Sequence, residues 1–279
     1  MSREYSSNYI EYLIKTDCIH GITDPELLRA IISDCSSHYF NYIKKTDLSR
    51  VCFDGIDVRG YDFTGCKGVK INPQTVWDKS LEDVKLSGVE IIGSFDGVDI
   101  SGTDFTRSKG AKKIDPQKVR GKNLRFTKLS GVEIIGSFDG VDISGTDFTG
   151  SKGAKINPQT VRDKCLEYAT LSEVEIIGSF DGVAIEETDF TGSKGAKKID
   201  PQKVRGSLRF TKLSGVEIIG SFDGVDISGT DFTGSKGAKI DPQTVDYKIF
   251  FGKSLKNTKL SGVEIIGSFD DVDIECTDF

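Results

Sequence analysis

Large apolar residues follow one another at intervals of about five residues through most of the chain. After Phe63 they stand at Ile71, Val76, Leu81, Leu86, Ile91, Phe95, Ile100 and Phe105. This spacing differs from the roughly 3.6 residues of a helix turn and the roughly 2 of a flat strand. It indicates a chain that turns a corner about every five residues and sends one large side chain inward from each side. Smaller residues are expected to fill the corners of the same core: Val84, Val89, Gly93, Val98 and Thr103.

A longer repeat contains this short period. Residues 129–161 recur at 213–245 with one change, Asn157 against Asp241, and KKIDPQKVRG occurs at both 112–121 and 197–206. Five of the six prolines fall at one phase of the longer period. The chain is therefore a repeat protein with units of about 42 residues, in which each unit contacts mainly its neighbours.

Residues 48–279 resemble the pentapeptide-repeat family. The resemblance is carried by SLEDV-KLSGV-EIIG-SFDGV-DISGT at 80–103 and its copies. It implies a mainly β fold, a right-handed quadrilateral β-helix (solenoid) of about eleven coils with four pentapeptides each. Gln74, Lys79, Gln117 and Lys122 depart from the family pattern and predict less regular turns. The phenylalanines expected to form the structural core are Phe53, Phe63, Phe95, Phe105, Phe138, Phe148, Phe180, Phe190, Phe222, Phe232 and Phe269.

Residues 1–47 lack the repeat and are expected to form a short α-helical N-terminal cap. Apolar spacing predicts a helix over 8–17, Asp24-Pro25-Glu26 marks the start of a second, and 38–45 suggests a third. A cap would cover the first layer of the solenoid core. A separate partner-binding module is the alternative for this segment.

Each repeat also contains extra residues, TGSKGAK or its variants, which are expected to protrude from one corner in a row and to add little stability. The insertion DYKIFFGKS at 246–254 is expected to be a protruding loop. The corner lysines would form a basic ridge, which is either a solvated surface or a binding ridge for a repetitive partner. These lysines are Lys109, Lys112, Lys152, Lys155, Lys194, Lys197, Lys236 and Lys239, with Lys113 and Lys198 beside them.

Aspartates provide the second charge pattern. Asp139, Asp142 and Asp147, with Asp223, Asp226 and Asp231 in a later copy, are expected to point outward as acidic ladders. Solvation and edge protection explain them, with calcium binding as the alternative, although the glycine-rich nonapeptide of calcium-binding β-rolls is absent. The segment Gly145–Lys152, GTDFTGSK, has the glycine spacing of a P-loop but ends in Ser-Lys and recurs in each repeat.

No catalytic, cofactor or metal site is predicted. His20 and His38 both precede the repeats, and the six cysteines show no metal or disulfide spacing, which is typical of reduced thiols in a cytoplasmic protein. The net charge of −6 is too small to indicate direct nucleic-acid binding or attraction to an anionic membrane. No stretch has the length of a membrane span, and MSREYSSN lacks the apolar core of a signal peptide.

The sequence therefore favours a non-catalytic structural or protein-interaction scaffold with an unknown protein partner. The alternative comes from the resemblance: some bacterial members mimic DNA, inhibit or protect DNA gyrase, and confer quinolone resistance. Those members are strongly acidic, whereas residues 48–279 contain 32 basic and 36 acidic residues. A last coil exposing Ile265, Phe269, Ile274 and Phe279 would favour a homodimer through the C-terminal coil.

Overall fold

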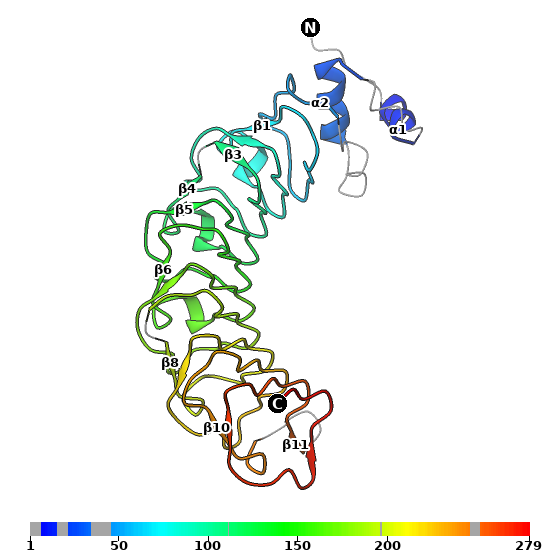
Figure 1. Ribbon diagram of the computed structural model, residues 1–279. Coiled ribbons are helices and arrows are strands. Elements are labelled where there is room, and N and C mark those ends of the chain that lie inside the picture. The colour runs from blue at the N-terminus through cyan, green and yellow to red at the C-terminus, as the bar shows by residue number, and fades with distance from the viewer. Residues whose placement is uncertain (1–6, 16–21, 35–45, 111, 196, 246–251) are drawn as a thin grey trace. The chain divides into compact units, whose positions relative to one another are not determined.

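The computed structural model describes residues 7–15, 22–34, 46–110, 112–195, 197–245 and 252–279. It divides into two compact units, Met1–Gly136 and Ser137–Phe279. In both units short parallel strands stack on one another, so the fold is mainly β, a β-solenoid of about 10 turns in total (Figure 1). This confirms the predicted fold class. The boundary predicted at residue 47 stays a prediction.

In its described residues the first unit has the α-helices α1 (Ser7–Lys15) and α2 (Pro25–Asp34), followed by coils. Three strands form one parallel sheet in the order β1 (Lys70–Ile71), β2 (Glu90–Ile91) and β3 (Lys109–Gly110). A second parallel pair joins β4 (Lys113–Ile114) to β5 (Glu133–Ile134).

The second unit contains four parallel pairs. They are β6 (Lys155–Ile156) with β7 (Glu175–Ile176), β8 (Lys198–Ile199) with β9 (Glu217–Ile218), β10 (Lys239–Ile240) with β12 (Glu264–Ile265), and β11 (Lys253–Ser254) with β13 (Val272–Asp273). Strands of two residues follow from the sequence period, because the chain turns a corner after each of them.

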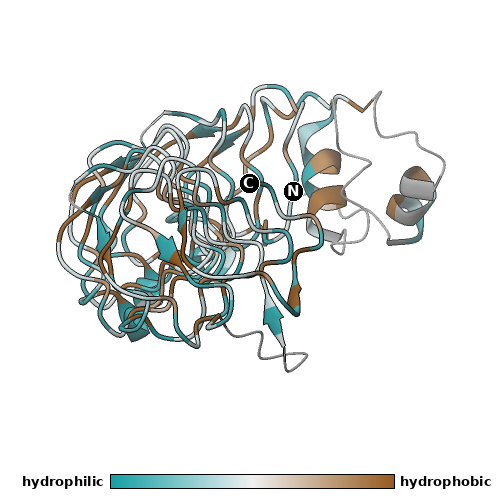
Figure 2. Ribbon diagram, turned by 60° about the horizontal axis from the view of Figure 1, so that its bottom comes forward, coloured by the Kyte–Doolittle hydropathy of each residue, from teal (hydrophilic) through white to brown (hydrophobic). Residues whose placement is uncertain are grey.

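The inward residues form a narrow apolar core inside each unit, and apolar and polar segments alternate along the coils (Figure 2). Ten of the eleven phenylalanines expected in the core are buried. They meet in pairs within one coil, edge to face: Phe95 and Phe105 have ring centroids 5.3 Å apart, and Phe222 and Phe232 5.4 Å apart. Such pairs add about 0.5–1.5 kcal/mol beyond the area that they bury.

Phe269 differs from the other ten. Its side chain is only half-buried, and its edge-to-face partner Phe279 is 64% exposed. Ile274 in the same coil is also exposed. The homodimer through this coil stays a prediction, which light scattering on the purified protein would test.

Buried threonines tie successive coils together. Thr103 donates its hydroxyl to the Leu81 carbonyl at 2.7 Å, and Thr230 donates to the Leu208 carbonyl at 2.7 Å. A threonine at this corner therefore satisfies its own buried hydroxyl by sharing a carbonyl that also accepts a backbone amide of its turn. Val84, Val89 and Val98 are buried as expected. Gly93 is not: it is exposed at a tight outer corner with φ of +115°, because the step from Ile91 to Phe95 is one residue short.

The sides that depart from the family pattern contain 3-10 turns, as expected: η3 (Trp77–Lys79), η4 (Arg120–Lys122) and η5 (Arg162–Lys164). The glutamines beside η3 and η5, and those at the same position of two other repeats, clamp the next coil. Gln159 donates its amide Nε2 to the carbonyls of Ser179 and Asp181, at 3.0 and 2.8 Å. Gln74, Gln202 and Gln243 make the same pair of bonds in their own coils.

Helices α1 and α2 pack against each other, and α2 contacts the first coil. Asp24 caps α2 by accepting the Glu26 amide at 2.9 Å. Tyr61 of the coil donates its hydroxyl to the Ile32 carbonyl at 2.6 Å, and Arg29 of the helix donates to the Asp54 carbonyl at 2.5 Å. The predicted third helix at 38–45 and the tip of the loop at 246–251 lie outside the described residues.

Candidate functional site

The corner lysines do not stand on protruding loops. Lys194 donates its backbone amide to the Val174 carbonyl at 2.7 Å and accepts the Ile176 amide at 2.9 Å, so it extends the strand ladder. Lys109 and Lys236 do the same in their repeats. The glycine that follows makes this possible: a Cβ on Gly110 would lie 2.3 Å from the Ile91 carbonyl oxygen. The prediction of protruding corners is therefore wrong for these three lysines, because their backbones pair with the preceding coil.

The ridge is also not uniformly basic. Glutamates from the intervening coils lie between its lysines and pair with them, so the surface is a Lys–Glu column. Lys155 pairs with Glu175 at 2.8 Å and Lys239 with Glu264 at 2.9 Å. Lys113 and Lys198 pair with Glu133 and Glu217, and Lys194 pairs with Glu173. These pairs are exposed, and each contributes about 0–1 kcal/mol.

Two lysines of the predicted ridge turn inward. Lys112 is half-buried and Lys197 is buried, at the place that Ala154 and Ala238 occupy in other repeats. Nζ of Lys197 donates to the Ser193 carbonyl and hydroxyl, at 3.0 and 2.9 Å. Burial lowers the pKa of both lysines. They therefore belong to the corner of the core and not to an outer ridge, whereas Lys152 and Lys236 are exposed.

The aspartates do not form acidic ladders either. Asp231 lies between Lys212 and Lys259 of the neighbouring coils, and Lys259 pairs with it at 3.0 Å. Asp104 has the same arrangement, between Lys85 and Lys128, so this surface is an Asp–Lys column. Asp189 of the same column lies between Thr170 and Lys212 and pairs with the lysine. The acidic-ladder prediction is wrong because aspartates 42 residues apart are not direct neighbours. An intervening coil lies between them and supplies lysine. Asp226 is buried, Asp142 and Asp147 are half-buried, and only Asp139 and Asp223 are fully outward.

The aspartates of the column also hold the turns. Oδ1 of Asp231 accepts the Thr233 amide at 2.9 Å, and Oδ1 of Asp226 accepts both the amide and the hydroxyl of Ser228. Burial acts to raise the pKa of Asp231, but hydrogen bonds from Thr233 and the charge of Lys259 outweigh it, and the pKa lies below its usual value. The same causes lower the pKa of Asp62, Asp104 and Asp189.

Two sets of large apolar side chains are exposed. The first is an isoleucine row, the second isoleucine of each EII motif: Ile92, Ile135, Ile177, Ile219 and Ile266. The second is a set of aromatic turns, Phe126, Tyr168 and Phe210, at one position of three repeats and each with a positive φ. Sequence reasoning missed both sets. The signal for the isoleucine row was the pair of consecutive isoleucines in each EII motif. A period of five places only one of the two in the core, so the other must be outside it.

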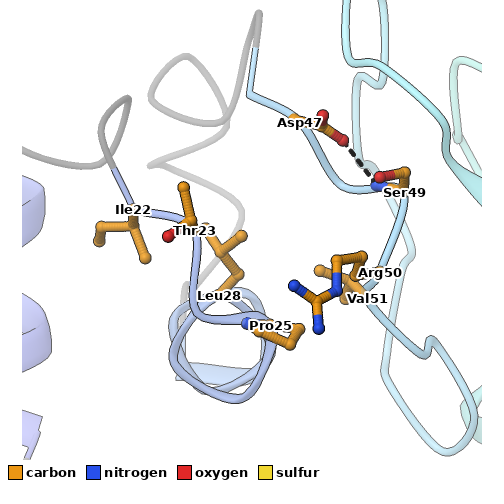
Figure 3. A pocket seen from close by; sticks show the side chains of 8 residues that line it. All are labelled: Ile22, Thr23, Pro25, Leu28, Asp47, Ser49, Arg50 and Val51. Carbon is orange, nitrogen blue, oxygen red and sulfur yellow. Dashed lines mark hydrogen bonds between the residues drawn. The ribbon is translucent and has the colours of Figure 1, made fainter.

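A cavity of about 220 Å³ lies between α2 and the first coil of the first unit. Pro25 and Leu28 of the helix face Arg50 and Val51 of the coil (Figure 3). Asp47 on its rim accepts the Ser49 amide at 3.0 Å, and hydrogen bonding from the Ser49 side chain, followed by that from its amide, lowers the pKa of Asp47. Sequence reasoning did not predict this cavity, because it depends on how the helix meets the coil.

Within the part of the chain that the structure describes, no three His, Cys, Asp or Glu side chains gather closely enough to hold a metal ion. The described cysteines, Cys52, Cys66, Cys165 and Cys276, form no disulfide. The P-loop-like segment 145–152 runs around a solenoid corner with Phe148 inside. None of the helices that the structure describes has the length and apolar character needed to cross a membrane.

No protein-family model matches the chain, and no curated protein matches it. Solved structures similar to it include full-length QnrB1, a plasmid-mediated fluoroquinolone resistance protein. The TM-score is 0.22 and the identity 16%, over 75% of this chain and 88% of QnrB1. A trypsin-treated form of QnrB1 gives a TM-score of 0.19 and 13% identity, over 76% of this chain and 87% of that one. Scores this low carry no argument about function.

Proposed function

We propose that the chain is a non-catalytic scaffold of the pentapeptide-repeat type that binds another protein along its outer faces. The isoleucine row carries this proposal. In the second unit Ile177, Ile219 and Ile266 are each about half exposed, at 47, 51 and 47%. Large apolar side chains that recur at one exposed position mark an interaction surface more often than isolated ones do.

The absence of catalysis is part of the proposal, and the arrangement of the acidic groups supports it. The buried and half-buried aspartates accept backbone amides in turns and pair with lysines of the next coil. A carboxylate with those partners has its pKa lowered, as for Asp231, which is opposite to what a general acid needs. Their recurrence in successive repeats favours a structural role.

The gyrase alternative requires a surface that resembles DNA, with phosphate-like negative charges in uninterrupted rows. Here the Lys–Glu and Asp–Lys columns alternate in sign from coil to coil. We therefore favour the scaffold. A supercoiling assay with purified gyrase separates the two: the scaffold proposal expects no inhibition and no protection against a quinolone, and either effect would favour the alternative.

The scaffold proposal is tested by a triple variant in one unit, Ile177→Thr, Ile219→Thr and Ile266→Thr. Threonine keeps the β-branched shape and removes the exposed apolar surface. Proteins captured from an extract of the source cells by immobilised wild-type and variant proteins are compared by quantitative mass spectrometry. We expect the captured amount of at least one protein to be lower with the variant by tenfold or more. The melting temperature of the variant should be unchanged.

The matched control replaces three lysines of the Lys–Glu column, Lys155→Gln, Lys198→Gln and Lys239→Gln. It is expected to keep the captured protein. An identical set of captured proteins for the wild type and the isoleucine variant would contradict the proposal.

A further inference from the structure

One repeat of the second unit differs from its copies on its outer turns. Its residues 167–168 are Glu-Tyr, where the equivalent pairs are Arg125-Phe126 and Arg209-Phe210. Its residue 187 is glutamate, where three other repeats have Gly102, Gly145 and Gly229. The large apolar inward residues of this repeat are unchanged in character and fully buried. Apart from Ala169, which replaces the buried Thr127 and Thr211 of the regular copies, the difference concerns the outer turns.

In the two regular copies each aromatic ring carries its own arginine. The guanidinium carbon of Arg125 lies 5.4 Å from the ring centroid of Phe126, and that of Arg209 lies 5.4 Å from the ring centroid of Phe210. These distances are within the range of a cation–π contact. Among the described residues no cation lies over the Tyr168 ring, because the residue before it is Glu167.

The glutamates Glu167, Glu186 and Glu187 act on Tyr168 instead, and the charge of Arg209 opposes them. The Tyr168 amide donates to the Glu186 carbonyl at 3.1 Å, and the Glu187 amide donates to the Arg209 carbonyl at 2.9 Å. The turn of Glu187 therefore lies between the turns of Tyr168 and Phe210, which are about 10 Å apart at a layer spacing of about 4.8 Å. The charge of Glu187 is the largest cause that raises the pKa of Tyr168, followed by burial and then by Glu186 and Glu167.

The backbone supports the same reading. Glu187 adopts φ of +57°, a left-handed conformation that costs a residue with a Cβ about 1–2 kcal/mol. Gly229 is free of that cost and lets the Phe210 ring lie over it, because a Cβ there would be 2.3 Å from the ring. The Glu187 side chain thus replaces a favourable glycine and occupies the place where a ring would otherwise lie.

We propose that the Tyr168 ring, with the Glu167 and Glu187 carboxylates beside it, binds an arginine side chain of a partner protein. This inference rests on the proposed scaffold function. The incoming guanidinium takes the place that Arg125 and Arg209 fill in the regular copies. A guanidinium suits the site better than an ammonium group because its plane stacks on a ring while its edge donates to carboxylates. Arg209 does not fill the site, since it stacks on Phe210 and lies 3.9 Å from Glu186.

The experiment is a titration of the ¹⁵N-labelled full-length protein with the peptide acetyl-Ser-Gly-Arg-Gly-Arg-Gly-Ser-amide, followed by NMR. We expect saturable shifts of the Tyr168 and Glu187 amides. A twin peptide with citrulline, which has the shape of arginine without its charge, is expected to bind at least fivefold more weakly. Equal binding of both peptides, or no saturable shift, would overturn the proposal.

The decisive variant is Glu167→Arg, which gives Tyr168 an internal guanidinium as in the regular copies. We expect peptide binding to weaken at least fivefold, with an unchanged melting temperature. Asp223→Arg is the matched control: it makes the same change in net charge at an exposed position on another side of the coil, and binding should fall by less than twofold. Equal losses in both variants would mean general charge attraction and would overturn the proposal.

Choline chloride distinguishes a small cationic ligand from a protein. If choline shifts the same amides at lower concentration than the peptide does, the site takes a small quaternary ammonium group and the proposal is wrong. A negative result in any of these titrations does not contradict the scaffold proposal. That proposal depends on the isoleucine row and is tested by the capture of proteins from a cell extract.

Discussion

Two stretches of the second unit, 165–190 and 207–232, share their large core residues and have different exteriors, and buried Ala169 of the first replaces buried Thr211 of the second. Phe180 and Phe190 meet edge to face at 5.4 Å and 81°, and Phe222 and Phe232 meet at 5.4 Å and 83°. Outside, the first stretch has Glu167, Tyr168, Thr170, Glu173, Glu186 and Glu187 where the second has Arg209, Phe210, Lys212, Gly215, Ser228 and Gly229. The comparison shows that in a solenoid the inward residues determine the coil, while the outward residues are free to acquire a new surface.

The largest effects are expected from the shared interior. Phe190→Ala and Phe232→Ala each remove a fully buried ring and leave a cavity, which costs about 3–5 kcal/mol. Because the two sites match, the losses should agree within about 1 kcal/mol in chemical denaturation. A much smaller loss for Phe190→Ala would show that the divergent stretch has a looser core.

An exchange at the left-handed turn is expected to have the next largest effect. Gly229→Glu adds backbone strain and displaces the Phe210 ring, so it should lower the free energy of unfolding by about 1–2 kcal/mol. Glu187→Gly relieves the strain but raises the conformational entropy of the unfolded chain. It should therefore raise the free energy of unfolding by at most about 1 kcal/mol. The measurement is again equilibrium unfolding. A stabilising Gly229→Glu would contradict the role given to this glycine.

The Asp–Lys column predicts a pH dependence. The pKa values of Asp189 and Asp231 are lowered in the folded state, so their contribution is complete above the unfolded pKa of about 4 and is lost as the pH falls through the lower folded values. Asp231→Asn keeps the turn acceptor and removes the charge. This variant should lower the free energy of unfolding by about 0.5–1 kcal/mol at neutral pH. Its free energy of unfolding should also fall less steeply with acidification below about pH 4. An unchanged steepness in this acidic range would contradict this assignment.

Thr170→Lys restores the lysine that the divergent stretch lacks. Thr170 lies between Asp147 and Asp189 in the column, so a lysine there has a carboxylate on each neighbouring coil. For an exposed pair the expected gain is at most about 0.5 kcal/mol, and it should shrink in high salt. A loss of stability in low salt would show that the column does not accept a lysine at this coil.

The core was predictable from sequence because its signal is local. One large residue every five positions specifies which side chains enter, as the burial of Phe95 and Phe105 illustrates. The outer surface was not, because a residue's neighbours in a column come from coils some 20–28 residues away. Asp231 and Lys259 meet only in a register that includes the insertion at 246–254. The pairing of Lys109 with the neighbouring strand likewise depends on the close contact of Gly110 with the Ile91 carbonyl. The five-residue period of the sequence does not predict that contact.

The divergent surface at Tyr168 is carried on a core that keeps the large apolar residues of the regular copy. The most direct test is the equilibrium unfolding of a variant in which four outer residues are replaced by those of the regular copy: Glu167→Arg, Tyr168→Phe, Glu186→Ser and Glu187→Gly. The account predicts a single cooperative transition with a free energy of unfolding within about 1 kcal/mol of the wild type, or above it. A fall of more than about 2 kcal/mol, or a second transition, would contradict the claim.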